Sequence, residues 1–191
     1  MKQLAIFCSG GGSNAKAIID YFHGHSEIRV ALMVVNKPNI GAIRHAEAAG
    51  IPWVYFNRDQ FYHQPQEVMA QLHSAGIDCL ILAGFLWLVP EYLLNAYPDR
   101  VINIHPALLP KFGGKGMHGL NVHKAVKESG EVVTGITIHL CNKVYDEGKN
   151  LFQAEVSVNE QDSPEDIARK VLSLEHQHYA PVIERYLSES S

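Results

Sequence analysis

The sequence of 191 residues is poor in cysteine, has little excess charge and lacks a long apolar run. Three cysteines, Cys8, Cys79 and Cys141, are too few and odd in number for a disulfide framework. Because each lies in an apolar, strand-like run, we expect buried thiols in a reducing compartment. No apolar run approaches the roughly 18–20 residues of a membrane helix, and the apolar part of "MKQLAIFCSGGG" is too short for a signal peptide. These scarcities lead us to expect a cytoplasmic protein with no membrane partner.

The charge pattern excludes a further class of partner. The formal net charge is −4 and no basic stretch stands out, so we expect no nucleic-acid partner. No spacing of cysteine and histidine matches a structural zinc site, so we also expect no metal. A hydrophobic content of 47% with 19% charged residues is ordinary for a globular protein, and the length suits one domain.

Short apolar runs alternate with amphipathic stretches of helical period along the chain. The runs predict strands at 3–8, 28–36, 52–57, 78–84, 101–105, 133–141 and 151–158. The amphipathic stretches predict helices at 14–22, 41–50, 65–76, 90–97, 121–129 and 164–188, the last with Ser163 as its N-cap. Continuous apolar strands favour a parallel sheet buried on both faces, and the closeness of the last two strands favours an antiparallel pair. We therefore expect an α/β fold whose sheet is parallel at first and mixed toward the C-terminus.

A glycine loop, "CSGGGSNAKAI", follows the first predicted strand and opens the first predicted helix. Three glycines allow close approach of a ligand, and a helix N-terminus favours a phosphate. The spacing Gly10-x-Gly12-x-x-Ala15 also fits a relaxed dinucleotide fingerprint. That fingerprint requires an acidic residue after the second strand, where this chain has Asn36 and Lys37. A mononucleotide-like phosphate is therefore favoured over a dinucleotide, with a tight turn that binds no ligand as the alternative.

A polar pair, Asn103 and His105, interrupts the predicted strand 101–105. Side chains alternate along a strand, so the pair shares one face, and Pro106 ends the strand just beyond it. An amide donor beside an imidazole suits stabilisation of an oxyanion, and the histidine can also move a proton near neutral pH. The alternative is a purely structural pair at the end of a strand.

A carboxylate follows the next predicted strand. Thr137 and His139 share one face of strand 133–141, which runs into a turn, "YDEG", that contains Asp146. A carboxylate held near His105 could orient the ring, raise its basicity or order a water for proton transfer. The spacing alone does not establish that the two residues meet.

Five segments in this order, "FCSGGGSNAKAI", "LAGFLWLVP", "NIHPALLPKF", "GITIHL" and "YDEG", resemble the folate-dependent formyltransferase family over essentially the whole chain. The resemblance implies a Rossmann-like sheet of about seven strands, mostly parallel with antiparallel C-terminal strands and with helices on both faces. It implies one domain, 1–191, with a nucleotide-binding half at about 1–100 and a folate and catalytic half at about 101–191. The glycine loop and the final helix point to the branch that formylates glycinamide ribonucleotide in purine synthesis. We expect no room for the RNA-binding domain that a relative acting on methionyl-tRNA carries.

The resemblance also implies roles for particular residues. Asn103 and His105 would stabilise a tetrahedral oxyanion formed by direct attack on 10-formyltetrahydrofolate, and Asp146 would assist proton transfer. The nucleotide phosphate and ribose would be bound by Gly11, Gly12, Ser13, Asn14 and Glu175. The folate would be bound by Leu86, Trp87, Leu88, Cys141, Asn142, Val144 and Tyr145. The partners would be small-molecule substrates, and the protein would be a monomer or a homodimer. The sequence departs from many relatives at Trp87, where they have a basic residue.

Three rival functions stay open from the sequence. The first is transfer of a formyl group to another acceptor, such as a sugar-nucleotide amine or water. The second is a nucleotide-dependent oxidoreductase that uses the glycine loop, against which the missing acidic residue after the second strand speaks. The third is a non-catalytic nucleotide-binding module, which would not need Asn103, His105 and Asp146 together.

Overall fold

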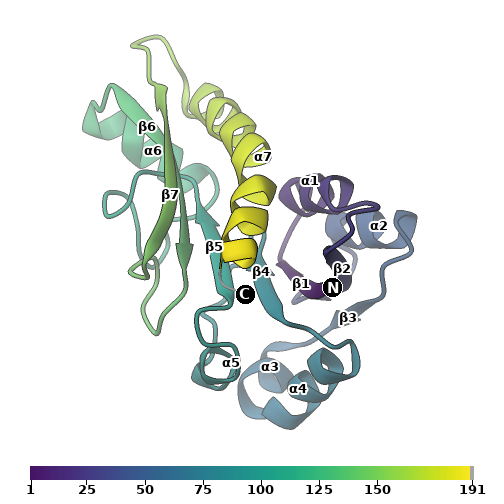
Figure 1. Cartoon of the computed structure of the whole chain (residues 1–191). Coiled ribbons are helices and arrows are strands. Elements are labelled where there is room, and N and C mark those ends of the chain that lie inside the picture. The colour runs from purple at the N-terminus through teal and green to yellow at the C-terminus, as the bar shows by residue number, and fades with distance from the viewer. Residues whose placement is uncertain (190–191) are drawn as a thin grey trace. The chain divides into compact units, whose positions relative to one another are not determined.

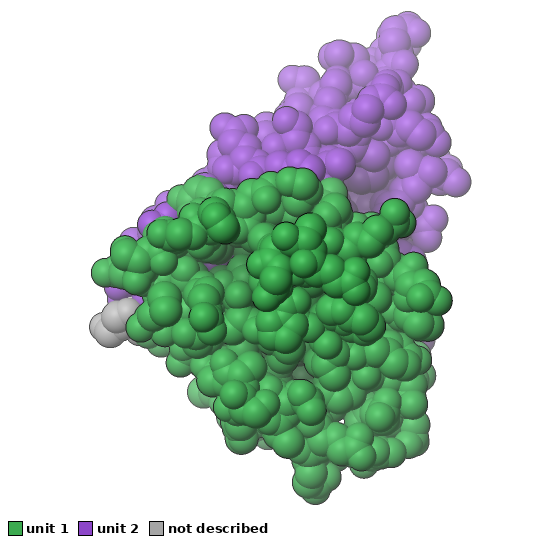
Figure 2. All heavy atoms as spheres, turned by 90° about the vertical axis from the view of Figure 1, so that its right-hand side faces the viewer, with its two compact units in different colours: residues 1–102 green, residues 103–191 purple. Residues whose placement is uncertain are grey.

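The structure is a computed structural model that describes residues 1–189. It contains seven strands in one mixed sheet, in the order β3-β2-β1-β4-β5-β6-β7. The sheet is mostly parallel with antiparallel C-terminal strands, which confirms the predicted fold class (Figure 1). The chain divides into two compact units, unit 1 from Met1 to Ile102 and unit 2 from Asn103 onward (Figure 2). None of the described helices is long and apolar enough to cross a membrane.

Unit 1 is built on a parallel sheet whose central strand is buried. β1 (Lys2–Cys8) pairs in parallel with both β2 (Ile28–Val35) and β4 (Cys79–Leu82), and β3 (Trp53–Tyr55) extends the sheet beyond β2. The side chains from Leu4 to Cys8 are at most 1% exposed. This burial explains why the strand reads as a continuous apolar run and not as an alternating one.

The helices of unit 1 follow the predicted order with one addition. They are α1 (Ser13–Tyr21), α2 (Gly41–Ala48), α3 (Arg58–His63), α4 (Pro65–Ser74) and α5 (Glu91–Ala96). Helix α3 was not predicted, although Asn57 and Gln60 form a reciprocal capping box at its start. Pro90 is the N-cap of α5, so this helix begins one residue later than the predicted range 90–97. Six residues are too few for a clear helical period, so only the caps could have revealed α3.

Unit 2 contains the last three residues of β5 (Val101–His105), the hairpin β6 (Val133–Leu140) and β7 (Asn150–Ser157), and two helices. β6 and β7 pair antiparallel from Val133↔Ser157 to His139↔Asn150, as predicted. The helices are α6 (Leu120–Ser129) and α7 (Pro164–Glu189). Ser163 Oγ accepts a hydrogen bond from Asp166 N at 3.1 Å, so the predicted cap of α7 is present.

The cysteines are all free, as expected, but they are not all buried. Burial raises the pKa of both the Cys8 and the Cys79 thiol to about 12, so neither is a thiolate at neutral pH. The expectation of burial is wrong for Cys141, which is only partly buried. The reason is that β6 ends one residue earlier, at Leu140.

Candidate functional site

A polar cluster in unit 2 gathers around the end of β5. Asn103 is partly exposed, whereas the side chains of Ile102 and Ile104 are buried. His105 is the last residue of the strand and is 3% exposed. His105 contacts Asp146 directly, since its Nδ1 lies 3.5 Å from Asp146 Oδ2. Asn103 is linked to Asp146 through His139, whose Nε2 lies 3.1 Å from Asn103 Nδ2 and 3.6 Å from Asp146 Oδ1. The fold therefore brings together the three residues to which the sequence assigned the chemistry.

Asp146 reaches the cluster from the turn between β6 and β7. Its backbone has a φ of 58°, in the left-handed region that an aspartate tolerates better than most residues. Gly148, two residues later, packs so closely that an added Cβ would lie 1.6 Å from Leu140 O. Only glycine permits that approach, so the turn can close and direct Asp146 inward. Asp146 Oδ2 accepts a hydrogen bond from Gly114 N at 2.9 Å, which holds the carboxylate in place.

His139 is a fourth member of the cluster, to which the sequence analysis gave no role. Its Nδ1 lies 2.9 Å from Leu140 O, and its Nε2 lies 3.6 Å from Asp146 Oδ1. A carbonyl oxygen can only accept, so Nδ1 carries a proton; in the tautomer with that single proton, Nε2 accepts from Asn103 Nδ2. This bond fixes the orientation of the Asn103 amide and uses one of its two N–H groups. The sequence pattern that could have indicated a role for His139 was its position on the same strand face as Thr137.

The electrostatics of the cluster favour a neutral imidazole beside a charged carboxylate. Burial lowers the pKa of His105, although the charge of Asp146 and the Phe112 carbonyl act in the opposite direction. Burial alone would raise the pKa of Asp146, but His139, His105 and Gly114 N–H together hold it below its usual value. At neutral pH, His105 can therefore accept a proton, and Asp146 can stabilise the imidazolium that results.

The glycine loop in unit 1 is held against the start of α2. Gly12 is the N-cap of α1 with a φ of 79°, and a Cβ added there would lie 2.7 Å from Ala42. Neither α1 nor α2 has a side-chain cap or an acidic residue in its first turn. Ser13 and Asn14 form the first turn of α1, so the predicted phosphate residues lie at a helix start, where the partial positive charge of the helix favours an anion. This arrangement is compatible with a bound anion.

Asn36 is buried at the end of β2, where a dinucleotide site would have an acidic residue. It is 5% exposed, and neither its Oδ1 nor its Nδ2 has a hydrogen-bond partner within residues 1–189. The pairing of Cys8 with Val35 places Asn36 level with Ser9, directly before the first glycine of the loop. Buried polar groups are almost always satisfied, so Asn36 indicates a place for a water or a ligand atom.

The other predicted binding residues lie in both units. Glu175, on α7, is 8% exposed, so its carboxylate is buried. In unit 1, Leu86 N donates to Ser9 Oγ and Leu88 O accepts from the Tyr62 hydroxyl. Trp87 packs among the rings of Phe61, Tyr62 and Phe85, with the Arg58 guanidinium 5.9 Å from its ring centre. Trp87 is thus part of an aromatic cluster in unit 1.

The predicted folate loop of unit 2 is largely exposed. Cys141 and Tyr145 are partly buried, whereas Val144 is 50% exposed. Asn142 Oδ1 accepts a hydrogen bond from Val144 N, which shapes the loop.

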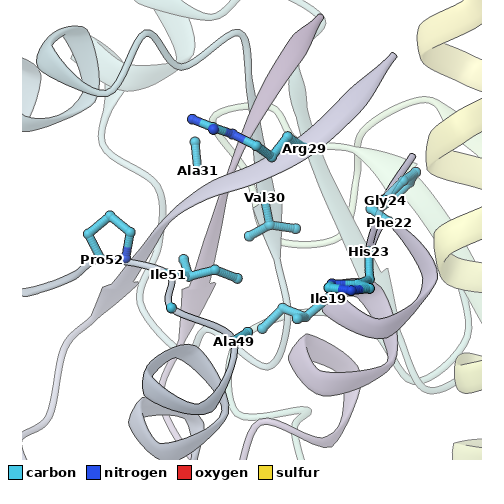
Figure 3. A pocket seen from close by; sticks show the side chains of 11 residues that line it. Ile19, Phe22, His23, Gly24, Arg29, Val30, Ala31, Ala49, Ile51 and Pro52 are labelled. Carbon is cyan, nitrogen blue, oxygen red and sulfur yellow. The ribbon is translucent and has the colours of Figure 1, made fainter. Parts of the chain in front are cut away.

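A separate hollow in unit 1 lies away from the predicted residues. It has a volume of about 340 Å³ and lies where α1 and α2 end and β2 begins (Figure 3). Its walls include Ile19, Val30 and Ile51, with Arg29 and His23 as the ionisable side chains. None of the predicted site residues lines it. Within residues 1–189, no group of three or more potential ligands is arranged to hold a metal ion.

Comparison with known proteins places the chain among formyl transferases. The family described as "Formyl transferase" matches residues 2–183. A chloroplastic phosphoribosylglycinamide formyltransferase of Arabidopsis thaliana is 44% identical over 95% of the chain, and that of Vigna unguiculata is 39% identical over 98%. The chain spans 64% and 62% of the lengths of these two relatives. The phosphoribosylglycinamide formyltransferase of Bacillus subtilis is 35% identical over 98% of the chain and 95% of its own length.

Solved structures of similar fold include those of phosphoribosylglycinamide formyltransferases. The crystal structure of phosphoribosylglycinamide formyltransferase from Bacillus halodurans superposes with a TM-score of 0.88 at 34% identity, and covers 100% of this chain and 97% of that one. The structure of the enzyme from Brucella melitensis superposes with a TM-score of 0.86 at 33% identity, over 97% and 95% of the two chains.

Proposed function

The chain belongs to the formyl transferase family, and from this premise we propose that it transfers the formyl group of 10-formyltetrahydrofolate to the amine of glycinamide ribonucleotide in purine biosynthesis. The observation that carries the proposal is the cluster of Asn103, His105, His139 and Asp146, in which both imidazoles are buried and the amide and the carboxylate are partly exposed. It combines an oriented amide donor, a neutral imidazole and a charged carboxylate, which acyl transfer to an amine requires. The names of the relatives support the choice of acceptor.

The proposed reaction is a direct attack. The amine nitrogen of the ribonucleotide forms a bond to the formyl carbon, and the carbonyl oxygen becomes an oxyanion. The second N–H of Asn103, which His139 leaves unused, donates to this oxygen. His105 accepts the proton that the amine loses, and Asp146 stabilises the imidazolium. The bond from the formyl carbon to N10 of the folate then breaks, and that nitrogen receives the proton.

We assign substrate binding to the residues that the sequence resemblance implies. The backbone donors of Gly11, Gly12, Ser13 and Asn14 would bind the ribonucleotide phosphate at the N-terminus of α1. Glu175 would accept hydrogen bonds from the ribose hydroxyls. The folate would be bound by the segments 86–88 and 141–145, mainly through backbone groups. A cytoplasmic location, and a monomer or homodimer with no nucleic-acid or metal partner, also remain predictions.

Absorbance of the folate product gives the test. The protein is mixed with 10-formyltetrahydrofolate and with either glycinamide ribonucleotide or a sugar-nucleotide amine. We expect turnover that depends on glycinamide ribonucleotide. Turnover with the sugar-nucleotide amine alone would show that this amine is the acceptor. Hydrolysis without any amine would show that the acceptor is water.

A further inference from the structure

We propose that the backbone carbonyl of Phe112 is a positioning group that fixes His105 as the tautomer with its proton on Nε2. The proton of the reaction would then arrive at and leave from Nδ1, on the side of Asp146. The assignment of the tautomer rests on the geometry alone, whereas its use in proton transfer rests on the proposed function.

The first step is the contact at Nε2. His105 Nε2 lies 2.7 Å from Phe112 O, within the range of a good hydrogen bond. A backbone carbonyl has no proton to give, so Nε2 must be the donor. A neutral imidazole carries a single N–H, and its other nitrogen then has a lone pair. In the neutral ring of His105, that nitrogen is Nδ1.

The second step is what Nδ1 faces. It lies 3.5 Å from Asp146 Oδ2, and both atoms carry lone pairs while the ring is neutral. They do not form a hydrogen bond in that state, and a proton on Nδ1 turns the contact into an attractive ion pair. His139 has the opposite tautomer, and its Nε2 already accepts from Asn103. Of the two rings beside Asp146, only His105 therefore has a free basic nitrogen.

The third step is how the Phe112 carbonyl is held. Phe112 has a φ of 56°, which is uncommon for a residue with a bulky side chain. At Gly113, an added Cβ would lie 2.6 Å from Leu109 Cδ2 and 3.3 Å from Asp146 Cβ. Gly114 N donates to Asp146 Oδ2 at 2.9 Å. One short segment, Phe112 to Gly114, thus contacts both His105 and Asp146 and holds the carboxylate and the imidazole in fixed positions relative to each other.

The N–H groups of Asn103 and His105 are not available to the oxyanion in the same way. While Phe112 O holds Nε2–H, this N–H is not available to an oxyanion. The N–H of Asn103 is then the donor at the start of the attack. Once it has received a proton at Nδ1, His105 contributes its positive charge, which Asp146 stabilises. This order refines the expectation that Asn103 and His105 both stabilise the oxyanion.

The experiment uses the full chain and two variants that both remove the phenyl ring. Glycine in Phe112→Gly accepts a φ of 56° without strain, so the carbonyl stays in place. Valine in Phe112→Val is β-branched and strongly disfavours that φ, so the carbonyl must turn. The nitrogen-15 spectrum of the His105 ring, assigned with His105→Gln, shows which nitrogen carries the proton at neutral pH. We expect a protonated Nε2 in the parent and in Phe112→Gly, and a mixture of tautomers in Phe112→Val.

The second measurement is the kcat and KM of the two variants. We expect kcat of Phe112→Val to be about tenfold or more below that of Phe112→Gly, with similar KM values, because the loss affects proton transfer and not binding. A protonated Nδ1 in the neutral parent would overturn the proposal, whether or not the variants fold. Equal tautomer populations and equal kcat in the two variants would show that the carbonyl does not position His105. If the parent has the expected tautomer but does not formylate glycinamide ribonucleotide, the proposed function fails while the tautomer assignment stands.

Discussion

Replacing Asp146 with asparagine separates the charge of this residue from its place in the fold. Asparagine tolerates the left-handed backbone that Asp146 adopts at φ 58°. Its side-chain oxygen can still accept the hydrogen bond from Gly114 N. The variant should therefore fold normally and lose mainly the negative charge beside His105.

The size of the effect follows from the distance to the imidazole. Opposite unit charges 3.5 Å apart attract by about 5 kcal/mol at an effective dielectric constant of about 20. The amide dipole of asparagine and nearby water recover part of this energy. We therefore expect a loss of about 3–4 kcal/mol from the transition state, which corresponds to a decrease in kcat of roughly 10²–10³. The KM values for both substrates should change little, because the charge on His105 develops only during the reaction.

Two measurements check this prediction. The first is the initial rate of folate product formation at saturating substrates, as a function of pH. Asp146 raises the pKa of His105, so its neutralisation should lower that pKa further and move the acidic limb of the rate profile to lower pH. The second is an NMR titration of His105 in both proteins. An unchanged kcat with an unchanged His105 titration would refute the reasoning and leave Asp146 as a turn residue.

Three other changes have defined outcomes. Gly12→Val should raise the KM for glycinamide ribonucleotide far more than the KM for the folate. The control is Gly50→Val, which has a similar φ of 66° but open space around it and should affect only stability. A change confined to the folate KM would mean that the loop binds the folate. Asn103→Ala should lower kcat about 10²–10³-fold without unfolding the protein, and a near-normal kcat would remove Asn103 from the mechanism. Burial lowers the pKa of His105 and of His123, so the unfolded chain binds protons that the fold does not, and the free energy of unfolding should decrease as the pH falls below about 6.5. Chemical denaturation at several pH values measures this slope, which His123→Gln should reduce; a slope that this variant leaves unchanged would contradict the assignment to His123.

The sequence alone determined those features that depend on local patterns. Apolar runs identified every strand, and the run is continuous where the strand is buried on both faces, as in β4. Alternation along a strand placed Asn103 and His105 on one face, and it placed Thr137 and His139 on another strand in the same way. The glycine loop and the cap at Ser163 were also readable, since backbone freedom and helix capping are properties of a few neighbouring residues.

Only the tertiary structure decided which polar groups meet. Asp146 reaches His105 because the β6–β7 turn closes on Gly148, and His139 links Asp146 to Asn103 through a contact that no spacing in the sequence specifies. The carbonyl of Phe112 belongs to a loop whose backbone angles follow from packing against Leu109 and Asp146. Every residue has the same carbonyl, so its role is invisible in the sequence. The pKa of His105 and of Asp146 likewise depends on burial and on neighbours that come together only when the chain folds.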